Sequence, residues 1–129
     1  MNKLNKENIT GISALLVHAA KIDEIYSEHE KDLIRNFIKS YRKDDDVDET
    51  LMKAEEIEND SNQLLNFTNI IKKNSMDIKK DIIEHLWKVI ISDNTIDQYE
   101  SNLMRRICGL IYFSDKECAE IKLKLINSK

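Results

Sequence analysis

Acidic side chains recur at matching places in two parts of this chain. Asp93, Asp97 and Glu100 lie between two apolar helical patterns, and Asp23 and Glu30 precede Asp93 and Glu100 by one and the same interval. Carboxylate oxygens are the ligands that hard cations such as Ca²⁺ and Mg²⁺ prefer. These five residues are therefore candidate metal ligands at two interhelical loops.

The same pattern has a purely structural interpretation. Ser27 and Asp97 stand where a helix N-cap is expected, and Glu30 and Glu100 follow three residues later. This spacing is typical of a capping box, in which the cap and the glutamate satisfy each other's backbone N–H groups. Each N-cap contributes about 0.5–2 kcal/mol to stability, so the two glutamates could serve the fold alone.

Asp23 and Asp93 are harder to explain by capping. Each is expected near the C-terminal end of a helix, where the helix dipole disfavours a negative charge. A partner should compensate for that charge. Backbone N–H groups of the following loop, a basic side chain such as Arg35 or Arg105, and a bound cation all remain candidates for this partner.

The helices that must position these acids are predicted by apolar residues that recur every 3.6 positions. With no Pro and two Gly in 129 residues, the chain also lacks the turn residues that β-rich folds use. We predict a single all-α domain of six or seven helices, built from two pseudo-repeated helix–loop–helix units at about 6–42 and 75–112. An acidic connector at about 43–50 separates the units. The shift that carries Asp23 onto Asp93 also superposes Ile12 on Ile82, Leu16 on Leu86, Leu33 on Leu103 and Arg35 on Arg105.

The same periodicity predicts which residues begin helices and which side chains face the core. Ser27, Asp48, Ser75, Asp97 and Ser114 are predicted to begin helices, and the pattern over 48–73 fits either one helix or two. Trp87 is expected in the core, and His85 on a polar surface stripe. The apolar positions predicted to face inward in the third helical segment and the last helix include Leu51, Ala54, Ile57, Leu65, Cys118, Ile121, Leu123, Leu125 and Ile126.

Composition excludes several classes of protein. No two glycines lie close together, so no Gly-rich phosphate-binding loop exists. A net charge of −4, with basic and acidic residues interspersed, argues against nucleic acid as a partner. No stretch is long enough to span a bilayer, and the N-terminal apolar run keeps helical spacing, so we expect no membrane span and no cleaved leader. Cys108 and Cys118 have no CxxC pairing and are expected as buried thiols in a reducing, cytoplasmic compartment.

The acidic connector offers a rival cation site. Asp44, Asp46, Asp48 and Glu55 fall at positions 1, 3, 5 and 12 of an EF-hand loop. The glycine that makes the sharp turn at position 6 is replaced by Glu49. A solvated loop is therefore the favoured interpretation.

The second half of the chain, IIEHLWKVIISDNTIDQYESNLMRRICGLIYFSDKE, resembles the TerB-like family, which includes tellurite-resistance TerB proteins and the N-terminal domain of the co-chaperone DjlA. The resemblance implies an all-α fold, a divalent-metal role for Asp93 and Glu100 and, by the repeat, for Asp23 and Glu30, and a link to tellurite and stress responses. The family's glycine after the aspartate is replaced by Glu24 and Asn94, and the His-Pro-Asp motif of a J-domain is absent. The family's pattern is matched by Leu86, Trp87, Asp93, Ile96, Glu100 and Arg105.

Together these observations predict a cytoplasmic, non-enzymatic helical domain that acts through contacts with a protein partner. The cation at the acidic loops would be Ca²⁺, Mg²⁺, Mn²⁺ or Zn²⁺. The alternative is a purely structural interaction module whose acids only cap helices. An enzyme is disfavoured because no nucleophile–base pair or cofactor loop is recognisable.

Overall fold

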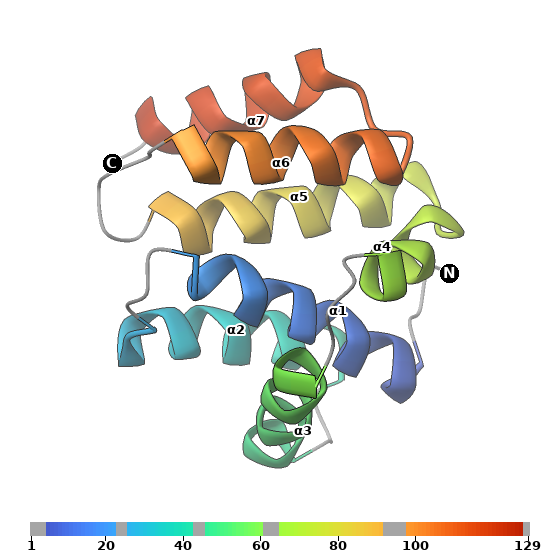
Figure 1. Ribbon diagram of the computed structural model, residues 1–129, viewed down its shortest axis with the longest axis vertical. Helices are drawn as coiled ribbons and strands as arrows, with labels where there is room; N and C mark the ends of the chain where they lie inside the picture. The colour runs from blue at the N-terminus through green and yellow to red at the C-terminus, as the bar shows by residue number, and fades with distance from the viewer. Residues whose placement is uncertain (1–4, 23–25, 43–45, 61–64, 92–97, 128–129) are drawn as a thin grey trace.

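The computed structural model describes residues 5–22, 26–42, 46–60, 65–91 and 98–127, and these ranges form seven helices (Figure 1). The all-α prediction is thereby confirmed. In the described ranges no helix has the length and apolar character needed to cross a membrane. The helices are α1 Lys6–Ala20, α2 Glu28–Tyr41, α3 Val47–Asp60, α4 Leu65–Lys72, α5 Met76–Ile91, α6 Gln98–Leu110 and α7 Asp115–Asn127.

Helix α1 is the centre of the fold. Its sequence is apolar on almost every side, which is typical of a helix that is buried all round. From Ile9 to Val17 every residue of α1 is buried. The helix packs against α2, α3, α4 and α5, which together remove its apolar surface from water.

The other helices form layers on either side of α1 (Figure 1). Helices α2 and α3 lie on one side, while α5 lies on the other and carries α6 and α7 on its outer side. Helix α4 packs against both α1 and α6 and so joins the two sides. Gly11 allows α4 to approach closely, because a Cβ atom there would lie 2.5 Å from Ile70 Cδ1.

Corresponding helices of the two pseudo-repeats begin at a constant offset along the chain. The interval from the start of α1 at Lys6 to the start of α5 at Met76 equals the interval from the start of α2 at Glu28 to the start of α6 at Gln98. The two glutamates of interest, Glu30 and Glu100, therefore occupy the same position in the first turn of their helices.

Several helix starts follow the predicted caps. The Ser27 side chain caps α2, and Ser75 and Ser114 accept hydrogen bonds from the N–H groups of Ile78 and Glu117. The region around 48–73 contains two helices, α3 and α4, rather than one.

The predicted cap at Asp48 is wrong. Helix α3 begins at Val47, and Asp46 is its cap, with Oδ1 accepting from Glu49 N–H at 3.2 Å. Both residues are acidic and both precede an apolar pattern. The sequence therefore did not distinguish them.

Helix α6 ends in a Schellman turn whose left-handed residue is not glycine. The N–H of Phe113 donates to Cys108 O at 2.8 Å and that of Tyr112 to Gly109 O at 3.4 Å. Tyr112 adopts φ 60°, a conformation that costs an L-residue energy and is normally given to Gly. Its ring lies under Lys72 Nζ, 4.9 Å from the ring centroid.

Four apolar residues predicted to face inward are exposed. Ile57 is 41% exposed, Leu65 47%, Leu123 56% and Ile126 38%. Ile57 lies on α3, which packs on α1 and α2 at one edge of the molecule. Leu123 and Ile126 lie on α7, which packs on α5 and α6 at the opposite edge (Figure 1), whereas Leu65 is the first residue of α4. A helix at the edge of the molecule buries a narrower stripe than its apolar residues would fill.

Burial predicts very different effects for two leucines. Leu86→Ala in the fully buried part of α5 should destabilise the protein by about 2–5 kcal/mol, because it removes buried methyl groups and leaves a cavity. Leu123→Ala on exposed α7 should change the free energy of unfolding by no more than about 0.5 kcal/mol. Urea unfolding of both variants measures this. A loss of several kcal/mol in Leu123→Ala would mean that α7 packs with its other face inward.

Candidate functional site

The two glutamates of the repeated pattern are buried carboxylates. Glu30 is 5% exposed and Glu100 is 3% exposed, each in the first turn of its helix. The other three predicted ligands, Asp23, Asp93 and Asp97, lie outside the described residues. The structure therefore places two of the five candidates, one in each pseudo-repeat.

Glu30 forms the predicted capping box with Ser27. Its Oε1 accepts from Ser27 N–H at 2.8 Å and from the Ser27 hydroxyl at 3.1 Å, while Ser27 Oγ accepts from Glu30 N–H at 3.2 Å. One carboxylate oxygen is thus committed to the start of α2. The capping box predicted for Ser27 and Glu30 is confirmed.

Glu100 is even less exposed than Glu30. Burying a carboxylate is costly unless neighbouring groups compensate for its charge. Among the described residues, no three His, Cys, Asp or Glu side chains come together as metal ligands would. Asp93 and Asp97, which precede Glu100 in sequence, lie outside the described residues.

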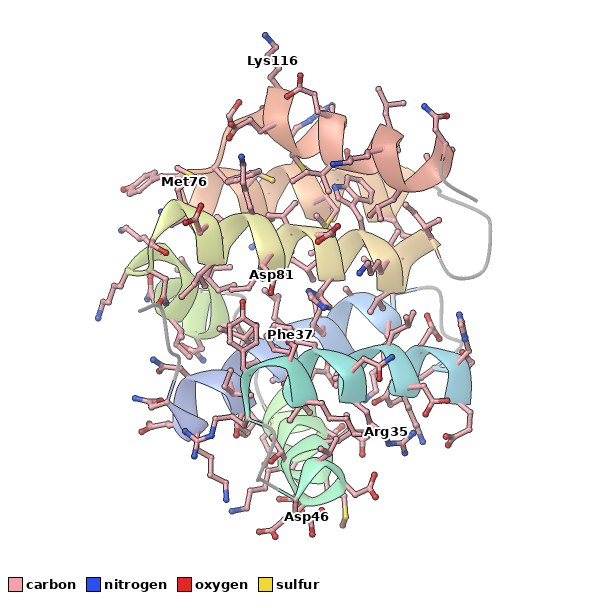
Figure 2. All side chains as sticks on the ribbon, turned by 180° about the vertical axis from the view of Figure 1, so that it is seen from behind. Arg35, Phe37, Asp46, Met76, Asp81 and Lys116 are labelled. Atoms are coloured by element: carbon pink, nitrogen blue, oxygen red, sulfur yellow. The ribbon has the colours of Figure 1, made fainter. Side chains whose placement is uncertain are left out.

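Arg35, proposed from the sequence as a partner for Asp23, makes three other ion pairs. Its guanidinium lies 2.6 Å from Asp32 Oδ1, 3.2 Å from Glu28 Oε2 and 2.9 Å from Asp48 Oδ1. The hydrogen bonds to Asp32 and Glu28 are the main reasons why the pKa of Arg35 is raised. Because Asp48 belongs to α3, this group ties α2 to α3 (Figure 2).

The described residues of the EF-hand-like pattern all have other roles. Asp46 caps α3, Asp48 pairs with Arg35, and Glu55 accepts a hydrogen bond from the Tyr26 hydroxyl at 2.7 Å. Residues from Val47 onward are helical rather than looped. Asp44 lies outside the described residues, and the helical conformation of residues 47–55 is incompatible with the loop of an EF-hand.

Two tyrosine–carboxylate bonds were not predicted from the sequence. The Tyr26 hydroxyl donates to Glu55 on α3, and the Tyr41 hydroxyl donates to Asp81 Oδ2 on α5 at 2.5 Å. Burial, reinforced by the hydrogen bond to the carboxylate, raises the pKa of both tyrosines. The paired residues are 29 and 40 positions apart in the sequence, so no local spacing could have indicated these bonds.

His85 belongs to the same contact between α2 and α5, which corrects its predicted place on the surface. Its side chain is only 14% exposed and packs edge-on against Phe37, with ring centroids 5.1 Å apart. Its Nδ1–H donates to the Asp81 carbonyl at 2.8 Å. Figure 2 shows Phe37 and Asp81 at this boundary between the two helices. The residues near His85 in sequence are polar and predicted a surface position, whereas its aromatic contact, Phe37, comes from α2 and could not be read from local sequence.

Helices α5 and α7 enclose a surface groove of about 500 Å³. Its walls combine charged and apolar side chains: Asp77, Lys80, Asp81, Glu84, Ile121, Lys124 and Leu125. All of α7 is described, and Cys118 is its one buried residue. Helix α7 therefore presents most of its surface to solvent, including the exposed Leu123 and Ile126.

Comparison with known proteins matches the chain to a family. The family model described as Tellurite resistance protein TerB matches residues 10–123, which is most of the chain. No curated protein and no solved structure shows significant similarity to it.

The raised tyrosine pKa values predict a loss of stability at alkaline pH. A tyrosine whose folded-state pKa lies above its ordinary value of 10.0 stabilises the fold fully below about pH 10. That contribution is lost as the pH rises further, because the unfolded chain ionises first. Tyr41→Phe should cost about 1 kcal/mol at neutral pH and make the alkaline decline shallower.

Urea unfolding between neutral and strongly alkaline pH measures this dependence. Tyr112→Phe is the matched control, since that side chain is 69% exposed and Phe keeps the aromatic contact with Lys72. If the free energy of unfolding of Tyr41→Phe declined with rising pH as steeply as that of the wild type, the Tyr41–Asp81 bond would not be the cause of the alkaline loss of stability.

Proposed function

The chain belongs to the TerB family, and we propose that it is a non-enzymatic, cytoplasmic helical domain that acts through contacts with a protein partner. The observation that carries this proposal is the exposure of α7. Leu123 is 56% exposed and Ile126 38%, and other residues of the same helix line a groove that α7 forms with α5. An exposed apolar surface rimmed by polar residues is typical of a protein-interaction site.

The groove has the composition expected of a contact surface. Ile121 and Leu125 are half-buried in its wall, while Lys80, Lys124 and Glu84 bring charges of both signs to it. An apolar helix face of the partner could cover Ile121 and Leu125 in this groove, and the charges would set its orientation.

We further propose a divalent cation at the junction of α5 and α6, held by Asp93, Asp97 and Glu100. The support is the chemistry of these three carboxylates, which are hard oxygen donors and lie within eight residues of one another in the sequence. When bound, the cation would neutralise these carboxylates and hold the two helix ends together. Ca²⁺, Mg²⁺, Mn²⁺ and Zn²⁺ are the candidates.

The first acidic loop favours the structural alternative. Glu30 already accepts two hydrogen bonds from Ser27, so Asp23 and Glu30 are the weaker candidates for a metal site. A role in tellurite resistance is proposed from the family's description alone, and a role in the stress response from the sequence resemblance described above.

Site-specific crosslinking tests the partner surface. A photoreactive phenylalanine analogue at Leu123 should crosslink in cells to a discrete protein, because the side chain projects from α7. The same analogue at Met52, which is 62% exposed on α3, is the matched control. Leu123→Asp should abolish copurification of the crosslinked protein without changing the melting temperature. Identical products from both positions would contradict the assignment of α7 as the contact surface.

Thermal unfolding of chelator-treated protein tests the cation. A cation present at about 100 times its Kd should stabilise the fold by about 2.7 kcal/mol, seen as a higher melting temperature with one of the four ions. Asp93→Asn should remove this shift, and Asp23→Asn should leave it unchanged. If no ion raised the melting temperature, the acids would be caps and loop anchors. If Asp23→Asn removed the shift and Asp93→Asn did not, the site would belong to the first loop.

A further inference from the structure

The two cysteines of the chain meet where α6 packs against α7. Cys108 is fully buried and Cys118 is 5% exposed, and both are free thiols. The Cys108 thiol is hydrogen-bonded to Cys118. The Schellman turn at the end of α6 reverses the chain between them.

The two thiols differ in their access to the surface. A surface pocket of about 200 Å³ is lined by Cys118 and not by Cys108, which is fully buried. The pocket could admit a molecule of a few heavy atoms. Its walls are Trp87, Ser101, Met104, Arg105, Asp115, Cys118, Ala119 and Lys122.

The surroundings of Cys118 favour its thiolate. The hydrogen bond from Cys108 is the main reason why the pKa of Cys118 lies below its ordinary value, and the indole N–H of Trp87 adds to the effect, 3.3 Å from Sγ. Lys122, whose Nζ lies 5.3 Å from the centroid of the Trp87 ring, also stabilises negative charge there. Burial of Cys118 and the negative charge of Asp115 raise the pKa of Cys118 and so oppose these effects. The pKa of Cys108 is raised, so Cys108 keeps its proton and donates it.

We propose that Cys118 and Cys108 form a reversible redox pair, in which Cys118 is oxidised by a small hydroperoxide that enters this pocket and Cys108 resolves the product as a disulfide. A thiolate is the form that attacks such oxidants, and a sensor cysteine typically lies next to a resolving one. The inference rests on neither the metal nor the partner proposed above.

The reaction has two steps. The Cys118 thiolate attacks one peroxide oxygen, the O–O bond breaks, and the leaving oxygen takes up the proton that Cys118 had given up. Cys118 is thereby oxidised to a sulfenic acid, and the hydroperoxide is reduced to water or an alcohol. The sulfur of Cys108 then attacks the sulfenic sulfur, an S–S bond forms, the S–O bond breaks, and hydroxide leaves with the Cys108 proton as water. A dithiol reductant reverses the change.

Hydrogen peroxide added to the reduced, full-length protein tests this assignment. Intact-mass analysis should show the loss of two hydrogen atoms per monomer, and thiol titration the loss of both cysteines. Trp87 is the one tryptophan of the chain and touches Cys118 Sγ, so its fluorescence should change with the reaction and return on addition of dithiothreitol. The folded protein should form the crosslink severalfold faster than the same chain unfolded in guanidinium.

Variants assign the roles of the two thiols. Cys108→Ser should stop at a sulfenic acid that dimedone traps, whereas Cys118→Ser should not react in the folded state. Lys122→Gln, on the surface, should slow the reaction. Lys116→Gln, an exposed lysine on the same helix that lines neither this pocket nor the groove between α5 and α7, should leave the rate unchanged.

Three results would overturn the proposal. The first is that the folded wild type keeps both thiols under peroxide that oxidises free glutathione. The second is that crosslinking is faster in the unfolded chain. The third is that Cys118→Ser, with an unchanged far-ultraviolet circular dichroism spectrum, still reacts with dimedone after peroxide treatment, which would make Cys108 the reactive thiol.

Discussion

The burial of α1 on every side is the constraint on which the rest of the structure depends. A helix of this composition has no face that it can present to water, so neighbours must cover all of it. Helices α2, α3, α4 and α5 do so, and α6 and α7 in turn cover α4 and α5. Gly11 marks where this cover is tightest, since α4 could not approach α1 there with a larger side chain unless Ile70 moved.

Polar bonds at the edges of this apolar core then set how the covering helices lie. Tyr26 joins Glu55, Tyr41 joins Asp81, and Lys21 Nζ at the end of α1 lies 2.9 Å from Glu58 Oε1 on α3. Each links two parts of the fold at the margin of the core, where apolar contacts alone would permit sliding. Hydrogen bonds with a charged acceptor are directional and relatively strong, so a few of them suffice to fix the register of one helix on another.

Local sequence signals predicted the parts of this fold that depend on neighbours in the chain. The caps at Ser27, Ser75 and Ser114, the capping-box role of Glu30 and the burial of Trp87 follow from spacings of three or four residues. Features that depend on partners from distant helices escaped prediction. His85 looked polar because its aromatic partner comes from α2, and Leu123 looked buried because periodicity does not reveal how many neighbours a helix has. The pairing of Cys108 with Cys118 likewise required the packing of α6 on α7.

The order of the helices along the chain has a consequence for biosynthesis. Helix α1 begins at Lys6 and is made before every helix that covers it, whereas α5 begins only at Met76. At roughly 5–20 residues per second, the ribosome needs on the order of 4–14 seconds to make the intervening length. During this interval the most apolar helix of the protein has part of its surface uncovered. Nascent chains should therefore be most prone to aggregate, and most dependent on chaperones, between the emergence of α1 and that of α5.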